Sequence, residues 1–463
     1  MKNWSKNLKT LAQIAMKINL QKYSEYKDSG VEWLGEIPSH WQLIKLRNIG
    51  IFSASGIDKY LKINEPAVKI INFTDVYANK SMTLDSSFDY MVVTTPESNR
   101  VRHLVNMGDL IFLPSSETYE DLGAAALVNE KLENTSFSYH VIRFVFQKDI
   151  DHSFRKYLTN NDFVLNQFSR QGKGSTRKII GRGVFKDVQV IIPPKEEQTA
   201  IANFLDRKTA LIDQAVDIKQ KQIELLKERR QILIHKAVTR GLNPNAKLKD
   251  SGVEWIGKIP EGWEVKRLKD VCCVNLNSLP ENTNNNFEFN YVDIGSVTLE
   301  SGINNIEKFS FKSAPSRARR IVKKGDTIIS TVRTYLKAID FIDEVKSSYI
   351  YSTGFAVLEP KEFVFPEFLA YFVRSDAFTE QVTVNSKGMS YPAINSNDMS
   401  RLTVVHCGFD EQIQIVKYIE NATAKIATAI SLKQQEIEKL KEYKATLINS
   451  AVTGKIKISN YAK

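Results

Sequence analysis

The chain has 463 residues, of which 42% are hydrophobic and 25% charged, a balance typical of soluble globular proteins of two to four domains. The formal net charge of +11 suits a polyanionic partner, nucleic acid above all, although plain solubility would also explain it. Three cysteines make no disulfide framework, six scattered histidines show no metal-ligand spacing, and no apolar run reaches the ~18 residues of a membrane span. We therefore expect a cytoplasmic protein.

Residues 1–21 read as an N-terminal extension that is basic and weakly amphipathic. Lys17 interrupts its only candidate apolar core, LAQIAMKINL, which argues against a signal peptide. We expect a short helix or a disordered arm here.

A duplicated motif follows. Lys27–Leu46 (KDSGVEWLGEIPSHWQLIKL) and Lys249–Leu268 (KDSGVEWIGKIPEGWEVKRL) are identical at twelve of twenty positions, with an offset of 222 residues. Two tryptophans around an Ile-Pro turn indicate an anchored loop that leads into a strand. We expect these tryptophans in a structural core, with base stacking as the alternative.

Two globular segments, 22–192 and 247–406, each show a mixed α and β pattern. In the first we predict strands at Val68–Phe73, Leu110–Leu113, Tyr139–Phe146 and Val188–Ile192 and a helix near Phe154–Phe168. In the second we predict strands at Tyr291–Ile294, Thr327–Thr331, Gly354–Leu358 and Leu402–Val405 and a helix near Pro366–Val382. The segments share a Gly-Asp pair before a strand, Gly108-Asp109 and Gly325-Asp326, but little other sequence.

A long helix is predicted after each globular segment, in segments 193–246 and 407–463. Pro193–Gly241 starts with two prolines that precede the helix, and after them neither this stretch nor Asp410–Gly454 has a glycine or proline before its final glycine. Both carry a narrow apolar stripe that matches at an offset of 214 residues. A stripe this narrow favours one partner helix, as in a coiled coil. Residues that we place outside the stripe, such as Glu197-Gln198 and Glu411-Gln412, also match and indicate duplication. The matched pairs Lys219/Lys433 and Arg230/Lys444 interrupt the stripe and should snorkel.

These motifs in duplicate order resemble the specificity (S) subunit of Type I restriction–modification systems. The resemblance rests on GVEWLGEIPSHW and GVEWIGKIPEGW, on PPKEEQ and GFDEQ, and on the helix ends AVTRG and AVTGK, and it spans nearly the whole chain. The N-terminal extension and GFDEQ depart from the usual family layout.

The resemblance implies an α+β fold in which an antiparallel pair of long helices separates two target-recognition domains with approximate two-fold symmetry. It also implies binding of a bipartite DNA target, one half-site per domain. The implied partners are two modification subunits, which carry S-adenosylmethionine, and restriction subunits in the larger complex. The chain itself would bind no cofactor.

The sequence lacks the common motifs of the enzymes that act on DNA with this family. The sequence has no glycine-rich cofactor loop after a strand, no Asn/Asp-Pro-Pro-aromatic segment and no P-loop. Asp340, Asp343, Glu344 and Lys346 have the residue types of a magnesium nuclease, but such groups are common by chance. We predict a subunit that is not an enzyme; the alternative is a coiled-coil scaffold whose globular halves bind protein.

Polar and basic loops near the Gly-Asp strands are the candidate DNA contacts, because arginine reads guanine while lysine and serine mostly hold phosphate. In the first domain the candidates are Ser115, Ser116, Thr118, Tyr119, Lys173, Ser175, Thr176, Arg177 and Lys178. In the second they are Arg317, Arg319, Arg320, Arg333, Thr334, Tyr335, Lys337, Lys387, Ser390 and Tyr391.

Overall fold

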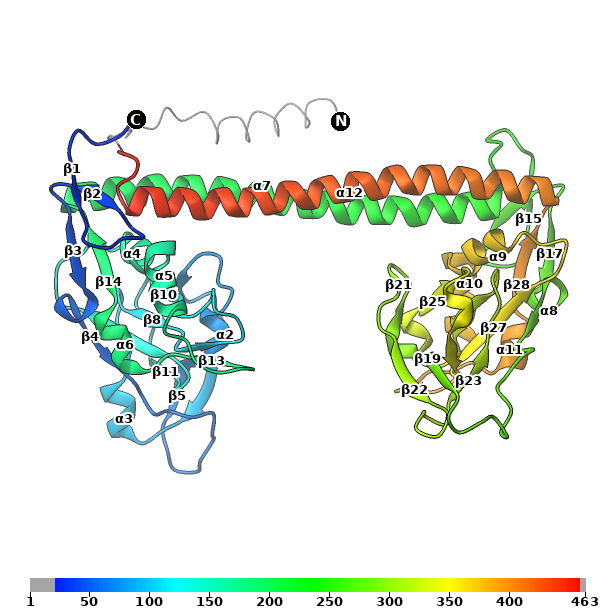
Figure 1. Ribbon diagram of the computed structural model, residues 1–463, viewed down its shortest axis with the longest axis horizontal. Helices are drawn as coiled ribbons and strands as arrows, with labels where there is room; N and C mark the ends of the chain where they lie inside the picture. Colours follow the sequence, from blue (N-terminus) through cyan, green and yellow to red (C-terminus); the bar gives the residue numbers. More distant parts are fainter. Residues whose placement is uncertain (1–20, 459–463) are drawn as a thin grey trace. The chain divides into compact units, whose positions relative to one another are not determined.

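The computed structural model describes residues 21–458, which divide into two compact units. Unit 1 comprises the described residues up to Lys219 and those from Gln435 onward, and unit 2 comprises Gln220–Gln434. In each unit an α+β domain lies against one half of the paired long helices (Figure 1). The predicted α+β class is confirmed, and the predicted N-terminal helix or arm falls outside the described residues.

The domain of unit 1 contains a five-stranded sheet of order β4-β12-β8-β10-β6 and a three-stranded sheet of order β11-β5-β7. The strands are β4 (Gly50–Ser53), β5 (Ala67–Ile71), β6 (Thr83–Leu84), β7 (Met91–Thr94), β8 (Leu110–Phe112), β10 (Ala125–Val128), β11 (Thr135–Phe137) and β12 (Ile142–Phe146). The helices are α2 (Phe73–Val76), α3 (Glu97–Arg102), α4 (Arg155–Thr159), α5 (Asp162–Ser169) and α6 (Arg182–Asp187). The uniformly apolar β8 lies inside the larger sheet with all its residues buried.

Unit 2 repeats this plan with the sheet orders β18-β27-β24-β25 and β22-β19-β26-β23. The strands are β18 (Cys272–Val274), β19 (Glu288–Val292), β22 (Glu307–Ser310), β23 (Ala318–Ile321), β24 (Thr327–Ser330), β25 (Ile339–Phe341), β26 (Ile350–Ser352) and β27 (Phe355–Pro360), with a small hairpin β20 (Val297–Thr298) and β21 (Gly302–Ile303). The helices are α8 (Leu268–Val271), α9 (Pro366–Val373), α10 (Asp376–Asn385) and α11 (Ser396–Ser400). The shared order supports duplication of the domain.

Each domain is closed by a two-stranded stem. In unit 1, β3 (Gln42–Lys45) pairs antiparallel with β14 (Gln189–Ile192), and in unit 2, β17 (Glu264–Arg267) pairs with β28 (Thr403–His406). Immediately inside the stem, the Leu46 amide donates to the Val188 carbonyl at 2.9 Å and the Leu268 amide to the Leu402 carbonyl at 2.7 Å. The chain thus enters and leaves each domain at adjacent, equivalent points.

All eight predicted strands are present, with bounds that shift by a few residues. Each of the two predicted domain helices is instead two helices. In unit 1, Asn161 separates α4 from α5. Its side chain caps the start of α5 by accepting a hydrogen bond from the Val164 amide at 3.2 Å. Ser375 has an extended backbone and separates α9 from α10 in unit 2.

The duplicated motif forms a hairpin that ends on a buried tryptophan. The hairpins are β1 (Tyr26–Asp28) with β2 (Glu36–Pro38), and β15 (Leu248–Asp250) with β16 (Lys258–Pro260). Trp41 and Trp263 are buried, as predicted. Trp33, in contrast, is 39% exposed. Its ring centroid lies 5.0 Å from that of Phe163, and the Arg170 guanidinium lies 4.7 Å from the Trp33 ring. The expectation of a core position is wrong for Trp33, because its loop lies at the surface of the domain, and Trp255 at the equivalent position in unit 2 is only partly buried.

The first turns of α7 (Lys195–Arg240) and α12 (Phe409–Val452) hold these anchors. The Trp41 indole donates to Glu197 Oε2 at 3.2 Å, and the Trp263 indole donates to Glu411 Oε2 at 3.0 Å. Both long helices are single and uninterrupted, as predicted.

The glutamines next to these glutamates are buried, which corrects our placement of them on a solvent-facing side. Gln198 accepts from the Asp151 amide and donates to the Pro193 carbonyl, both at 2.8 Å. Gln412 does the same with the Phe365 amide and the Cys407 carbonyl, again at 2.8 Å. The matched glutamines therefore join each long helix to the domain that precedes it.

Ion pairs fix the antiparallel direction of the helix pair within unit 1. Asp213 pairs with Lys444 at 2.7 Å, and Lys219, further along α7, pairs with Glu436, earlier on α12, at 2.6 Å. The two lysines do not snorkel as predicted, because carboxylates of the partner helix neutralise them at the interface. In unit 2, Ile234 and Ala237 of α7 share one core with Ile415 and Ile419 of α12.

The Gly-Asp pairs are structural turns that deliver the chain into β8 and β24. Gly108 and Gly325 have φ of +92° and +93°, a region that favours glycine. Asp109 and Asp326 are buried and accept from the backbone amide three residues earlier, each at 2.7 Å. Only Asp109 has a buried cation, since Arg143 Nε lies 2.7 Å from its Oδ2. Burial raises the pKa of Asp326 to about 6.

This difference predicts opposite effects of the same substitution. A raised folded pKa means that the Asp326 carboxyl favours folding at low pH, and that this contribution is lost as pH rises through about 6. Asp326→Asn keeps an acceptor for the Lys323 amide but has no carboxyl to ionise. The parent should lose about 1–1.5 kcal/mol of unfolding free energy through Asp326 between pH 5 and 7.5, and the variant should not show this loss. Asp109→Asn leaves Arg143 without its carboxylate and should cost about 3 kcal/mol.

Urea unfolding of both variants and the parent at pH 5 and pH 7.5 measures these effects. Asp326→Asn should be as stable as the parent or more stable at pH 7.5. If it were the more destabilising of the two at that pH, the assigned electrostatics of the Gly-Asp turns would be wrong.

Candidate nucleic-acid interface

In unit 1 the two predicted loops come together in a small sheet. β9 (Ser115–Ser116) pairs antiparallel with β13 (Lys178–Ile179). Lys173 and Ile179 exchange backbone hydrogen bonds of 3.1 and 2.8 Å, which closes residues 173–179 into a hairpin. We call this hairpin with the chain at 115–119 the domain 1 cluster.

Its side chains present cations beside aromatic rings. Arg177 Nε donates to Ser115 Oγ at 3.0 Å, and its guanidinium lies 4.8 Å from the Phe73 ring. The Lys178 ammonium lies 5.2 Å from the Tyr119 ring. Six of the predicted residues are exposed on the cluster: Thr118, Tyr119, Lys173, Ser175, Thr176 and Arg177. Cations interleaved with aromatic rings suit contact with phosphates and bases.

Unit 2 builds an equivalent arrangement, the domain 2 cluster, from residues 330–337 and 387–393. Lys387 and Ala393 exchange backbone hydrogen bonds of 2.8 and 2.9 Å, and Val332 bridges to Ala393. The Arg333 guanidinium lies 5.0 Å from the exposed ring of Tyr391, and Tyr335, Lys387 and Ser390 are also exposed.

Arg317 belongs to the same edge of the domain. Its carbonyl accepts from the Thr353 amide, and the adjacent Gly354 carbonyl accepts from the Thr331 amide, both at 2.8 Å. The exposed Arg317 therefore joins the start of the domain 2 cluster.

Two residues of the domain 2 cluster have unusual backbones. Arg333 and Lys337 flank the short helix η3 (Thr334–Leu336) with φ of 52° and 47°. Left-handed conformations in non-glycine residues cost about 1–2 kcal/mol each. Such strain is often found at functional sites, and here it sets the direction of the Arg333 side chain.

Both clusters lie at corresponding positions in the topology. In unit 1, β11 runs parallel to β5, and the chain segments after these strands adjoin the cluster. In unit 2, β26 runs parallel to β19, with Thr353 and Gly354 directly after it. The fold thus places the predicted contacts of each domain at one edge.

Several predicted DNA contacts are corrected by their surroundings. Ser116 and Thr334 are buried; Ser116 accepts from the Thr118 amide at 3.3 Å, and Thr334 lies 2.9 Å from Ser386 Oγ. Lys337 is neutralised by Asp376 at 3.4 Å and Glu380 at 3.3 Å. These three side chains shape the clusters and are not free to contact DNA.

The arginines of β23 are also held in the domain. Arg319 stacks 4.4 Å from the Phe311 ring. Arg320 lies in the strand, donates to Ser278 Oγ at 3.3 Å, and has its pKa lowered by burial. Neither presents a free guanidinium, so of the three predicted arginines before β24 only Arg317 is exposed.

Sequence reasoning missed the aromatic support of the domain 1 cluster. Phe73 lies under Arg177, and Tyr77 stacks on Phe73 with ring centroids 5.1 Å apart. They lie at the start of α2 and directly after its end, about 100 residues before the hairpin, so no local pattern connects them with Arg177.

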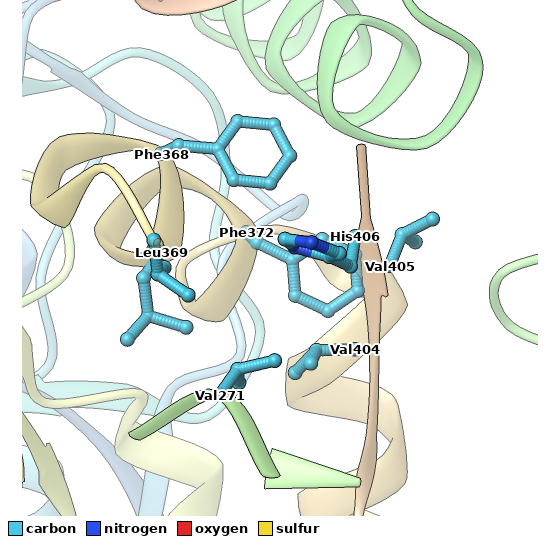
Figure 2. Close-up of a pocket in the computed structure, with 8 residues that line it drawn as sticks. Val271, Phe368, Leu369, Phe372, Val404, Val405 and His406 are labelled. Carbon is cyan, nitrogen blue, oxygen red and sulfur yellow. The ribbon is translucent and has the colours of Figure 1, made fainter. Parts of the chain in front are cut away.

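A void in unit 2 offers no ligand site. Figure 2 shows Phe368, Leu369 and Phe372 of α9 facing Val271 and the β28 residues Val404 and Val405. The space is about 10 Å³ and its walls are almost wholly apolar, so it is too small and too dry for a ligand.

The nuclease-like group is an internal ion pair. Lys346 Nζ lies 3.0 Å from Asp340 Oδ2 and 3.6 Å from Asp343 Oδ2, which places a lysine where a metal would need open carboxylates. Among residues 21–458, no cluster of three or more His, Cys, Asp or Glu side chains could hold a metal ion. No helix in this range is long and apolar enough to cross a membrane.

Comparison with known proteins agrees with this geometry. The family model described as the Type I restriction modification DNA specificity domain matches twice, at residues 38–228 and 260–442. The two matches correspond to the two domains, each with most of the long helix that follows it.

Relatives match over nearly the full length of the chain. The MjaVIII specificity subunit of Methanocaldococcus jannaschii is 22% identical over 96% of this chain and 99% of its own. The putative MjaX specificity subunit of the same organism is 23% identical over 96% of this chain and all of its own. A solved structure from work on assembly and conformational transition of the type I R-M system has a TM-score of 0.64 at 16% identity, covering 91% of this chain and 99% of that one.

The fold is thus that of this solved structure, and the two tandem matches of the family model together cover most of the sequence. The protein belongs to the Type I restriction modification DNA specificity family, as a specificity subunit.

Proposed function

We propose that domain 1 and domain 2 each read one half-site of a bipartite DNA target through the cluster at their edge. The chain is the sequence-specific DNA-binding subunit of a Type I restriction–modification system. The observation that carries the proposal is the repeated convergence of two polar loops, separate in sequence and with an arginine on one of them, at the same edge of two duplicated domains. Two readers with different side chains on one scaffold suit a target in two different halves.

Methyl transfer and cleavage are assigned to partner subunits. We expect two modification subunits, which hold S-adenosylmethionine, and restriction subunits in the larger complex, with the assembly in the cytoplasm. The sequence lacks the glycine-rich cofactor loop, the Asn/Asp-Pro-Pro-aromatic segment and the P-loop that these activities use, which supports this division. The alternative of a protein-binding coiled-coil scaffold is not favoured, because the full-length relatives are specificity subunits.

Reciprocal arginine variants test the assignment of one cluster to each half-site. Arg177→Ala and Arg333→Ala should each weaken specific binding by about 1–3 kcal/mol, because a bidentate contact to a base is lost. Each variant should relax sequence preference in one half-site only, and the two should affect different halves. Arg102→Ala, which removes an exposed arginine of α3 outside the cluster, is the matched control.

Binding of the reconstituted complex to duplexes with single base changes in each half measures the outcome. Loss of preference in both halves from one arginine, or an effect of Arg102→Ala as large as theirs, would refute the assignment.

Transplanting domain 2 into the position of domain 1 tests independence of the readers. Residues 269–401 can replace residues 47–187, because the stem closes both segments with the same backbone hydrogen bond. The chimera should direct methylation to sites that carry the second half-site sequence in both halves. Sequencing of methylated DNA would show this, and retention of the original first half-site would contradict it.

A further inference from the structure

An aromatic pair beside the domain 1 cluster has no assigned role. Tyr139 and His140 occupy the turn between β11 and β12, and their ring centroids are 3.8 Å apart. Tyr139 is 47% exposed. Exposed aromatic rings on a turn beside cationic side chains offer a surface on which a nucleic-acid base or sugar can pack.

The backbone places this turn next to Arg177. β11 runs parallel to β5 with Phe137 opposite Ile71, and the next amide, of Ser138, donates to the Ile71 carbonyl at 2.9 Å. The turn therefore emerges beside the segment that begins α2, where Phe73 supports the Arg177 guanidinium. The aromatic pair and Arg177 share one edge of domain 1.

The side chains of the pair take little part in holding the domain together. The core beneath the turn is made by Phe137 and Val141, which are both buried. Among the described residues, neither the Tyr139 hydroxyl nor the His140 ring has a hydrogen-bond partner. Their polar atoms remain available to a ligand.

The charges around His140 favour a neutral imidazole next to a cationic surface. Burial lowers the pKa of His140, and the positive charges of Lys59 and Arg177 lower it further, against the opposing charge of Asp58. A neutral imidazole offers one donor and one acceptor, which can contact a base edge. The two cations can hold the adjoining phosphates.

Domain 2 cannot present the same pair. Its equivalent turn, between β26 and β27, carries Thr353 and Gly354. A Cβ added to Gly354 would lie 2.1 Å from Ile294 Cδ1, so a larger residue at this position would require the Ile294 side chain to move. The pair is thus a difference between two surfaces that otherwise have the same plan.

We propose that Tyr139 and His140 are specificity-determining residues of domain 1, in which the Tyr139 ring packs against a base or sugar and the imidazole hydrogen-bonds a base edge. The inference rests on the proposed function of the domain 1 cluster. The pair lies between β11 and β12, in a different segment of the chain from the hairpin at 173–179. Domain 2 has no counterpart of the pair, so the second half-site would not receive this contact.

The test uses the full chain with its modification subunits and duplexes that carry the target. Tyr139→Ala and His140→Ala should each weaken binding about tenfold and reduce discrimination at one position of the half-site that Arg177 reads. Discrimination in the other half should not change. Tyr139→Phe, which keeps the ring, should bind like the parent, and Thr353→Ala is the matched turn substitution in domain 2, expected to leave the first half-site unaffected.

The outcomes separate this inference from the proposed function. If Arg177→Ala weakens binding while both alanine variants of the pair bind and discriminate like the parent, only the role of the pair is overturned. If Arg177→Ala is also without effect, the domain 1 cluster is not the reader. A lowered melting temperature with unchanged base discrimination would make the pair structural and would also overturn the inference.

Discussion

A carboxylate in the first turn of each long helix, hydrogen-bonded to a buried tryptophan, fixes the junction on which both units depend. Glu197 holds Trp41 and Glu411 holds Trp263 in the same geometry. The next residue of each helix, Gln198 or Gln412, is buried and bonds to backbone of the preceding domain. Buried polar groups must be paired, so these contacts set the direction in which each helix leaves its domain.

This constraint explains where the repeat kept its sequence. The tryptophan motif, the Glu-Gln pair and the helix ends meet one another inside each unit, so a change in one would leave a partner unsatisfied. Side chains on the domain surfaces beyond the stem make no such paired contacts with the helices, so they can change independently. Arg177 on Phe73 in one domain and Arg333 on Tyr391 in the other show how far the two reading surfaces have diverged on one topology.

Much of the fold could be predicted from the sequence, because periodicity and turn chemistry are local. The long helices and the eight predicted strands follow from such patterns, and the shared Gly-Asp pairs mark the entry to β8 and β24. The break at Asn161 depends on a capping hydrogen bond that competes with helix continuation. Burial of Gln198 was missed because the stripe describes contact with one helix and not with the domain.

The site was predictable only in part, for the same reason. Composition found the loops, and the Gly-Asp offset matched them between domains. Which side chains face outward depends on how each loop folds back: Ser116 and Thr334 turn inward, while Arg177 and Arg333 do not. Tyr139 and Phe73 adjoin Arg177 through strand pairing, which no local pattern reveals.

The most direct measurement is base-resolution mapping of methylated sites in DNA from cells that carry this chain with its modification subunits, compared with cells that lack it. The account predicts one motif made of two defined parts with undefined bases between them, absent from the comparison cells. A single continuous motif, or methylation unchanged when the chain is removed, would contradict the reading of one half-site by each domain.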